Sequence, residues 1–200
     1  MSERPEHISL LPPDLLLQAY SQGMFPMAME TGELGWFSPD PRGVIPIEEF
    51  RVPHGMKKLL RDCPFHIRIN TAYVSVMRGC ADRKSTWISD TILRSYTRLH
   101  ELGFAHSVEV WQGNTLAGGL YGVALGGAFF GESMFSRVPG ASKVALHALV
   151  TRLKSAGFTL LDTQWTTEHL SMFGAHDISR REYLRKLKAA LGRECVFPHE

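Results

Sequence analysis

The sequence predicts an α+β fold, with an antiparallel-rich sheet and flanking helices, and the second half of the chain carries this prediction. Three apolar or alternating runs of strand length begin at residue 106, and turn residues separate them: "HSVEVWQ", "LAGGLYGVALGG" and "AFFGESMFS". A long amphipathic helix pattern, "ASKVALHALVTRLKSAGF", and a further strand, "TLLDTQ", come next. An antiparallel meander followed by a long helix and another strand is the arrangement of an acetyltransferase-type (GNAT-type) core.

The first half of the chain contains weaker signals. "PPDLLLQAYSQG" predicts a short helix, because two prolines and Asp14 stand near its start and Gly23 follows its end. "SDTILRSYTRLHELG" predicts another helix, with Ser89 or Asp90 as N-cap and Gly103 at its end. Between these two we expect a long ordered loop or irregular small subdomain over residues 24–46, a helix over 53–62 and a strand over 65–70.

The C-terminal region predicts two more helices. "TTEHLSMFGA" is short, whereas "SRREYLRKLKAALG" places Ser179 and Glu182 at the spacing of a capping box. From the whole pattern we expect a small N-terminal domain over residues 1–45 and an acetyltransferase-like catalytic domain over residues 46–200.

The composition indicates an ordinary globular chain. Hydrophobic residues make up 44% and charged residues 21% of the 200 residues, and the formal net charge is +2, so a nucleic-acid partner would need a local basic patch. Cys63, Cys80 and Cys195 are scattered and lack C-x-x-C spacing, which argues against a disulfide framework or a zinc knuckle. We see no signal-peptide pattern and no apolar run of about 18 residues, and therefore expect a cytoplasmic protein that does not bind membranes.

Polar side chains interrupt two of the apolar strands. Asp162 and Gln164 follow Leu161 at a spacing of two from each other, so they project from the same face of their strand. Burying them without partners would cost about 1–3 kcal/mol each. Glu132 interrupts "AFFGESMFS" in the same way, next to Gly131, which permits close approach of a ligand.

These polar groups would form one site if the two strands were neighbours. Glu132, Asp162 and Gln164 would then converge at one mouth, as in a small-ligand site whose remaining lining is apolar. We expect the walls to be Leu120, Tyr121, Met134 and Phe135. The alternative interpretation makes "AFFGESMFS" an edge strand whose polar positions face water.

Several kinds of chemistry lack their motif. The chain has no H-E-x-x-H and no grouping of histidine with cysteine, so we expect no metal site. G-x-S-x-G is absent, which argues against a covalent serine mechanism. The glycine loop with which acetyltransferases hold the pyrophosphate of coenzyme A is also missing, because the corresponding stretch is "FSRVPGASKVALHAL". The core therefore predicts acyl transfer from a different carrier.

A basic helix and several aromatic rings favour RNA as this carrier. The cationic residues of "HGMKKLLRD" lie within one helical turn of each other: Lys57, Lys58 and Arg61. In loop-like surroundings, stacking on an unpaired base contributes about 1–3 kcal/mol. Three rings occupy such positions: Trp36, Phe37 and Trp87. Basic residues with stacking rings are typical of proteins that hold a single-stranded RNA end, although a solvated charged face is the alternative interpretation of the helix.

Three stretches of the chain resemble one known family. "AYSQGMFPM…GWFSPDPRGVIP", "HELGFAHSVEVW…LAGGLYGVALGGAFFGESMFS" and "LLDTQWTTEHLSMFGAHDISRREYL" are similar to leucyl/phenylalanyl-tRNA–protein transferases, from about residue 14 to about residue 190. The block "FGESMFS" together with "LDTQ", at this separation, is highly specific. The resemblance implies a small N-terminal domain followed by an acetyltransferase-like domain, and it agrees with the missing coenzyme A loop because the carrier is a tRNA ester.

The resemblance implies an aminoacyl transfer. Enzymes of this family take Leu, Phe or Met from the charged tRNA and attach it to the α-amino group of a protein that begins with Arg or Lys, which directs that protein to degradation. The implied partners are aminoacyl-tRNA and such acceptor proteins, with no cofactor. Because an amine attacks an ester that is already activated, positioning can supply much of the rate enhancement.

The resemblance also implies roles for individual residues. Gln164 orients the attacking amine, and Asp162 fixes Gln164 or relays the proton. Glu132 holds the aminoacyl end or, in a second interpretation, recognises the cationic side chain of the acceptor. Further substrate contacts are expected from Leu120, Tyr121, Gly131, Met134, Phe135 and Leu161 in the aminoacyl pocket and from Tyr20, Trp87 and Tyr96 around the terminal adenosine. The tRNA backbone would be contacted by Lys57, Lys58 and Arg61.

The chain departs from the family pattern at two positions near this site. Met27 follows the "FP" dipeptide where Trp is common, which affects one wall of the adenosine site, and Thr167 stands where other members carry Asn. Three alternatives stay open at this point. They are a coenzyme A-dependent N-acetyltransferase, a non-catalytic tRNA-binding protein, and a cell-wall peptide transferase that uses aminoacyl-tRNA.

Overall fold

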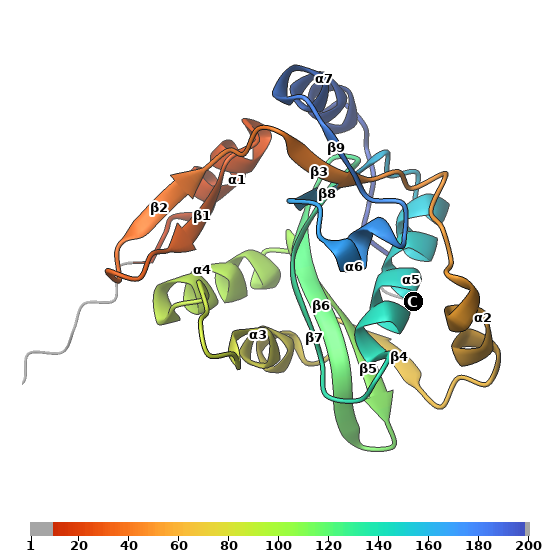
Figure 1. The fold of residues 1–200 in the computed structure, drawn as a ribbon. Helices are drawn as coiled ribbons and strands as arrows, with labels where there is room; N and C mark the ends of the chain where they lie inside the picture. Colours follow the sequence, from red (N-terminus) through yellow and green to blue (C-terminus); the bar gives the residue numbers. More distant parts are fainter. Residues whose placement is uncertain (1–9, 199–200) are drawn as a thin grey trace, which may run out of the picture.

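A seven-stranded sheet runs through the larger part of the molecule (Figure 1). The computed structural model describes residues 10–198, and the strands of this sheet follow the order β4-β5-β6-β7-β8-β3-β9. Neighbouring strands are antiparallel, except that β7 and β8 are parallel. The bounds are β3 Arg42–Ile45, β4 His66–Ile69, β5 Ala105–Gln112, β6 Thr115–Leu125, β7 Ala128–Ser136, β8 Leu160–Gln164 and β9 His176–Ile178.

The meander predicted from residue 106 onward is present. β5 pairs with β6 and β6 with β7, each in antiparallel fashion, and the predicted strand around Leu161 is β8. Together with the flanking helices, this confirms the predicted α+β class. β7 lies between β6 and β8, so the alternative of an edge strand for "AFFGESMFS" is wrong.

The N-terminal part of the described chain is a helix followed by a hairpin. α1 spans Pro13–Ser21, and β1 (Phe25–Ala28) pairs with β2 (Leu34–Phe37) as a separate two-stranded sheet. The expected loop or irregular subdomain over residues 24–46 is therefore corrected to three short strands, of which β3 enters the large sheet between β8 and β9. Four-residue strands broken by glycine and proline carry too little periodicity to be recognised.

The remaining helices include one that the sequence did not indicate, α3. The cap residues predicted for two others are confirmed, because the Ser89 hydroxyl accepts the Ile92 N–H and the Ser179 hydroxyl accepts the Glu182 N–H. β9 was likewise not expected. The helix bounds are α2 His54–Arg61, α3 Tyr73–Ala81, α4 Asp90–Glu101, α5 Ala141–Ser155, α6 Glu168–Ser171 and α7 Arg180–Leu191.

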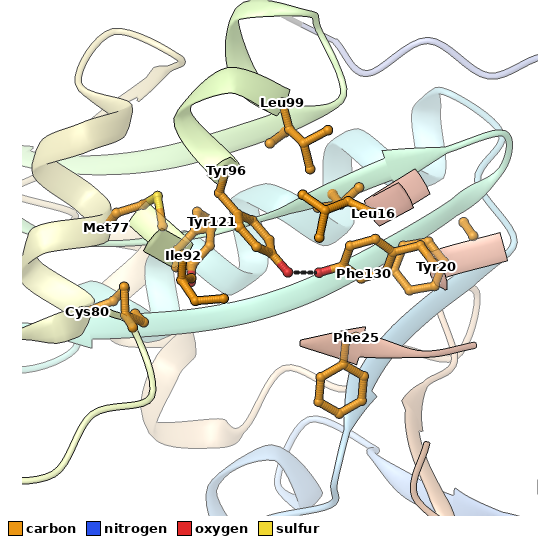
Figure 2. Packing of buried hydrophobic residues seen from close by; sticks show 14 of the residues in the cluster. Leu16, Tyr20, Phe25, Met77, Cys80, Ile92, Tyr96, Leu99, Tyr121 and Phe130 are labelled. Carbon is orange, nitrogen blue, oxygen red and sulfur yellow. Dashed lines mark hydrogen bonds between the residues drawn. The ribbon is translucent and has the colours of Figure 1, made fainter. Parts of the chain in front are cut away.

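Helices cover both faces of the sheet and bury two hydrophobic clusters. In Figure 1, α3 and α4 lie on one face and α5 on the other. Phe130 belongs to the cluster on the α3–α4 side, part of which Figure 2 shows with Tyr20 and Tyr96. Its neighbour Phe129 belongs to the cluster that includes the apolar side of α5. This change of side between consecutive residues is the alternation expected of a strand buried on both faces.

β7 and β8 lie side by side, as the grouping of their polar residues required, but they pair over part of their length. The parallel ladder joins Ala128 to Leu160, Phe129 to Leu161 and Phe130 to Asp162, and it ends there. The two strands therefore part after Phe130 and Asp162, which opens space between their carboxyl ends.

The division into domains at residue 45 stays a prediction. Residues 1–9 of the expected N-terminal domain lie outside the described residues. Within the described part, β3 begins at Arg42 and pairs with β8 and β9. The last residues assigned to the N-terminal domain therefore contribute a strand to the larger sheet.

Candidate active site

A cavity of about 340 Å³ opens where β7 and β8 part. The residues that follow the last ladder pair face it, Gly131 and Glu132 from β7 and Thr163 and Gln164 from β8. A mostly apolar cavity with a few convergent polar groups is the usual form of a small-ligand site. The other lining residues are Phe25, Met27, Arg83, Trp87, Leu120, Tyr121, Ser133, Met134, Leu146, Leu149, Trp165, Thr167, His169 and Leu170.

Glu132 occupies a β-bulge. Tyr121 of β6 pairs with Ser133, and the next residue of β6, Gly122, pairs with Gly131, so Glu132 is the extra residue between the two pairs. A bulge interrupts the ladder locally and re-aims a side chain. The bulge thus explains how a carboxyl group within an inner strand comes to line the cavity.

Buried tyrosines hold the Glu132 carboxyl from behind. The Tyr20 hydroxyl donates to Glu132 Oε1 (2.6 Å), and the hydroxyls of Tyr20 and Tyr96 are bonded to each other (Figure 2). Burial raises the pKa of Glu132 to about 8; the Tyr20 hydrogen bond opposes this rise, and the charge of Asp162 adds to it. Glu132 is therefore mostly protonated at neutral pH and becomes a carboxylate slightly above it.

Asp162 lies behind the cavity and is fully buried. Arg42 binds it through two parallel hydrogen bonds, from Nε to Oδ1 (2.9 Å) and from Nη2 to Oδ2 (2.7 Å). The Tyr183 hydroxyl also donates to Oδ2 (2.7 Å), and the main-chain N–H of Gln164 donates to Oδ1 (2.9 Å). Each carboxylate oxygen already accepts two hydrogen bonds from the protein, which fills its usual capacity.

Gln164 ends β8 in a strained turn. Its φ is +59°, and across it the Trp165 N–H donates to the Thr163 carbonyl (2.6 Å). Positive φ is uncommon for a residue other than glycine, and a three-residue turn with such a centre is strained. The buried side-chain Nε2 of Gln164 has no hydrogen-bond acceptor among residues 10–198. Because Gln164 lines the cavity, a substrate atom can satisfy that amide.

The structure brings part of the predicted set together around the cavity. Three predicted residues are buried behind the cavity: Tyr20, Tyr96 and Asp162. Tyr20 contacts the cavity residue Glu132, and Asp162 contacts the cavity residue Gln164. Because both tyrosines are buried, neither is an exposed stacking surface. The predicted residues that line it are Trp87, Leu120, Tyr121, Gly131, Glu132, Met134 and Gln164.

Two predicted wall residues lie outside the lining. Phe135 packs on Gly79 of α3, where an added Cβ would meet its ring at 2.7 Å. Leu161 is buried in the cluster on the α5 side. The bulge at Glu132 changes which side chains of β7 face the cavity after that residue, and nothing in the local sequence indicates this change.

The predicted RNA-contacting residues lie on α2, away from the cavity lining. Lys57, Lys58 and Arg61 are all exposed, and Arg61 pairs with the neighbouring Asp62 (3.0 Å). α2 reaches the start of α5, since Leu59 packs against the position before that helix, Gly140. The basic face is therefore exposed on a helix that lies next to the start of α5.

Sequence reasoning missed Arg42, Tyr183, Arg83 and Trp165. Arg83 Nη2 donates to the Ser133 hydroxyl (2.8 Å) and to the Met134 carbonyl (2.7 Å), which ties the loop before α4 to the rim of the cavity. Trp165 lines the cavity with 45% of its surface exposed. An arginine within the short run "RGVI" was the one available signal for Arg42, because burying a guanidinium requires a partner.

Charged groups are few at this site. Among the lining residues, Glu132 is the one carboxyl and Arg83 the one arginine or lysine. Over residues 10–198, no three His, Cys, Asp or Glu side chains are grouped as a metal site would need. Within the same range, no helix has the length and apolar character needed to cross a membrane.

The sequence matches one family over nearly its whole length. The family model for leucyl/phenylalanyl-tRNA protein transferase matches residues 44–188, and the family model for the N-terminal domain of these proteins matches residues 10–40. A relative from Gloeobacter violaceus is 53% identical over 188 residues, covering 94% of this chain and 97% of its own. One from Phenylobacterium zucineum is 55% identical over 188 residues, covering 91% and 85%. Both are named leucyl/phenylalanyl-tRNA–protein transferase.

Solved structures show a partial likeness at low sequence identity. An aminoglycoside N-acetyltransferase in complex with coenzyme A is 19% identical, with a TM-score of 0.38 over 66% of this chain and 89% of its own. L-PGS from Bacillus licheniformis is 10% identical, with a TM-score of 0.45 over 74% of this chain and 56% of its own.

Proposed function

The chain belongs to the leucyl/phenylalanyl-tRNA–protein transferase family, and we propose that the cavity at the parted ends of β7 and β8 is where its aminoacyl transfer takes place. As a member of this family, the chain is an aminoacyltransferase that moves an amino acid from tRNA to a protein. The observation that carries the proposal is the meeting of the Glu132 carboxyl and the unpartnered Gln164 amide at one mostly apolar cavity.

The reaction exchanges an ester for an amide. The α-amino nitrogen of the acceptor forms a bond to the carbonyl carbon of the aminoacyl ester, and the bond from that carbon to the ribose oxygen breaks. One proton leaves the amine and one reaches the departing ribose oxygen, so the step is balanced without an oxidant, a reductant or a covalent enzyme intermediate. What the protein must supply is alignment of the two reactants and a place for the proton.

Gln164 is suited to alignment and Glu132 to the proton. A carboxamide oxygen that accepts an N–H of the incoming amine directs the amine lone pair toward the ester carbon, and the Nε2 group that lacks a partner can donate to a carbonyl oxygen of the substrate. The pKa of Glu132, about 8, lies close to the value of about 7.7–8.0 for a free α-amino group. Proton transfer between the two is therefore nearly balanced, and a general base works best when its pKa lies near the operating pH, so Glu132 is suited to take the proton in slightly alkaline solution.

The surroundings of Asp162 favour a positioning role over a proton relay. Its two oxygens accept four hydrogen bonds, from Arg42, Tyr183 and the Gln164 main chain. A carboxylate engaged in this way has no lone pair directed at the cavity, and it does not line the cavity. Of the two roles that the family resemblance implies for Asp162, we adopt fixation of Gln164.

We propose Leu, Phe and Met as the transferred residues. The apolar wall formed by Leu120, Met134 and Leu146 surrounds a cavity of about 340 Å³, which suits a long or aromatic side chain. Such a wall discriminates by shape, which contributes about 1–3 kcal/mol between neighbouring side chains. Trp87 and Met27 also line the cavity and would pack against the terminal adenosine, with Met27 replacing an aromatic face by a flexible apolar one.

We propose proteins with N-terminal Arg or Lys as acceptors. Trp165 stands beside Gln164 with 45% of its surface exposed and meets the Phe25 ring edge-on at 5.5 Å. A guanidinium or ammonium group can lie over such a ring. The product would then mark the acceptor for degradation, and the protein would act in the cytoplasm, where charged tRNA is present. The backbone of that tRNA would contact Lys57, Lys58 and Arg61.

A transfer assay tests this function. Leu-tRNA carrying labelled leucine is mixed with the protein and with peptides that begin with Arg, Lys or acetyl-Arg. We expect label on the first two peptides and none on the blocked one, and Gln164→Ala should lower the rate at least about tenfold while the tRNA still binds. A parallel reaction with labelled acetyl-coenzyme A tests the acetyltransferase alternative. Absence of aminoacyl transfer, or equal labelling of acetyl-Arg, would overturn the proposal.

A further inference from the structure

Two consecutive residues of β3, Arg42 and Gly43, lie directly behind the Gln164 turn. Gly43 pairs with Gln164 and Val44 pairs with Asp162, so Thr163 is an extra residue in this ladder. The turn that carries the substrate-facing amide is therefore built against β3, a strand that enters the large sheet from the N-terminal part of the chain.

Arg42 is almost completely buried. It is 1% exposed, and its guanidinium lies 4.4 Å from the ring centre of Tyr183 and 5.0 Å from that of Phe25. Nε and Nη2 bind the two oxygens of Asp162, and Nη1 donates to the carbonyl of Gly23 (3.0 Å). A planar guanidinium can hold all these partners at fixed angles, which an ammonium group cannot do.

Asp162 passes this constraint to the Gln164 turn. Its Oδ1, which accepts from Arg42 Nε, also accepts the main-chain N–H of Gln164 (2.9 Å). With φ at +59°, Gln164 occupies a backbone region that side-chain-bearing residues seldom adopt, and such a conformation persists where the surroundings over-determine it. The ion pair is one of those surroundings.

Gly43 supplies the second constraint. A Cβ at this position would lie 2.5 Å from the carbonyl carbon of Trp165 and 2.6 Å from the nitrogen of Thr166. Both are main-chain atoms, so they can make room only if the backbone after Gln164 moves. The absence of a side chain at Gly43 lets the chain turn sharply over β3 at that point.

Arg42 also connects the turn to the other polar group of the cavity. The Gly23 carbonyl that it binds lies just after α1, and α1 carries Tyr20, whose hydroxyl donates to Glu132. One guanidinium therefore fixes the strand end that presents Gln164 and the end of the helix that supports Glu132. Both groups must keep their relative placement for an amine to meet the ester.

We propose that Arg42 and Gly43 are positioning residues for aminoacyl transfer, which act by holding the Gln164 turn in its strained conformation and in register with Glu132. Neither residue lines the cavity, so neither touches substrate. The inference rests on the proposed role of Gln164. It goes beyond that role, because it assigns the geometry of the site to a dipeptide more than 100 residues earlier in the chain.

Arg42→Lys and Gly43→Ala test the proposal. One control is Arg68→Lys, because Arg68 is an exposed arginine of β4 whose guanidinium lies over the Trp111 ring. The other is Gly192→Ala, because an added Cβ there meets no atom closer than 3.7 Å. We expect both test variants to lower kcat at least about tenfold, with KM for Leu-tRNA and its dissociation constant changed less than about twofold. The controls should keep the kcat of the wild type. Thermal unfolding confirms which variants are folded at the assay temperature.

The decisive result is a loss of kcat without a comparable change in tRNA binding. Full kcat in folded Arg42→Lys or folded Gly43→Ala would overturn it, and so would a loss confined to tRNA binding. Tyr183→Phe is the substitute should either variant unfold: it removes one donor to Asp162 and should lower kcat with KM unchanged, and a wild-type kcat there would also refute the proposal. Inactivity of the wild type would reject the proposed function. If Gln164→Ala lost activity while Arg42→Lys and Gly43→Ala kept it, the proposed function would stand and this inference would be rejected.

Discussion

Glu132→Gln is the substitution that most directly separates the role of the Glu132 carboxyl from that of the Asp162 carboxyl. Gln keeps the size of the side chain, and its amide oxygen can still accept the Tyr20 hydroxyl hydrogen that Glu132 Oε1 accepts at 2.6 Å. What it removes is the ability to lose or gain a proton at the cavity. The exposed Glu194→Gln is the matched control, because it makes the same chemical change at a residue that does not line the cavity.

The first expected effect is on stability. Burial raises the pKa of Glu132 from 4.5 to about 8, so the folded protein keeps a proton that the unfolded chain releases between these values. Stability of the wild type should therefore fall as pH rises through this window. The pKa difference sets an upper limit of about 5 kcal/mol. Because the cavity admits water, we expect about 2–3 kcal/mol, which corresponds to about 5–10 °C in Tm for a chain of this size.

The measurement is the Tm of the wild type and Glu132→Gln across this range. Glu132→Gln should gain on the wild type as pH rises from about 5 to about 8.5, while Glu194→Gln should follow the wild type throughout. A Tm difference that does not grow with pH would refute the argument that Glu132 is held protonated by its surroundings.

The second expected effect is on the rate. If both the acceptor amine and Glu132 must lose a proton, log(kcat/KM) of the wild type rises with a slope approaching about two on the acid side. Glu132→Gln should be slower, and its slope should fall to about one, because the amine alone still titrates. An unchanged slope would show that Glu132 is not the base and would leave it as a binding group for the aminoacyl end.

Three further predictions concern the rest of the site. Asp162→Asn should lower both kcat and stability, the latter by about 3–5 kcal/mol because Arg42 loses its buried partner, and thermal unfolding at neutral pH measures this. Met134→Ala enlarges the cavity and should shift donor preference from Leu toward Phe by about tenfold, measured by competition between the two charged tRNAs. Replacing Lys57, Lys58 and Arg61 together by alanine should weaken tRNA binding and lower the slope of log K against log salt by about two to three, with kcat at saturating tRNA unchanged.

Local signals account for the parts of the fold that the sequence predicted. β5, β6 and β7 alternate or stay apolar at strand length, and glycine marks the turn after Gln112. The caps at Ser89 and Ser179 are equally local, since each bonds to an N–H three residues later. The same holds for Gln164, whose polar character at the end of an apolar strand was visible without knowledge of its neighbours.

α3 shows why some elements could not be predicted. Its N-cap position is Ala72, which has no side chain to accept the first N–H groups. The buried carboxylate of Glu109 on β5 instead holds the residues that lead into the helix, because it accepts the main-chain N–H groups of Thr71 and Ala72, both at 2.8 Å. A contact supplied from almost 40 residues away leaves no trace in the local sequence.

Part of the site could not be predicted for the same reason, because its contacts join residues that lie far apart in the chain. Asp162 and Arg42 are 120 residues apart in the chain, and their pairing depends on β3 lying next to β8. The bulge at Glu132 likewise follows from the register of β7 against β6, and it decides that Met134 lines the cavity whereas Phe135 does not. Periodicity identifies which residues are polar or apolar, but register decides which of them meet.

The presence of two carboxyl groups on the neighbouring strands β7 and β8 also gives Arg42 an electrostatic role. The charge of Asp162 raises the pKa of Glu132, and the charge of Arg42 lowers it. Without the guanidinium, a buried unpaired carboxylate would lie near Glu132 and push its pKa further up, so the base form would be rarer at neutral pH. With it, the two groups separate in role: Asp162 is fixed in an ion pair and orders the Gln164 turn, while Glu132 titrates near the pH at which an α-amine does.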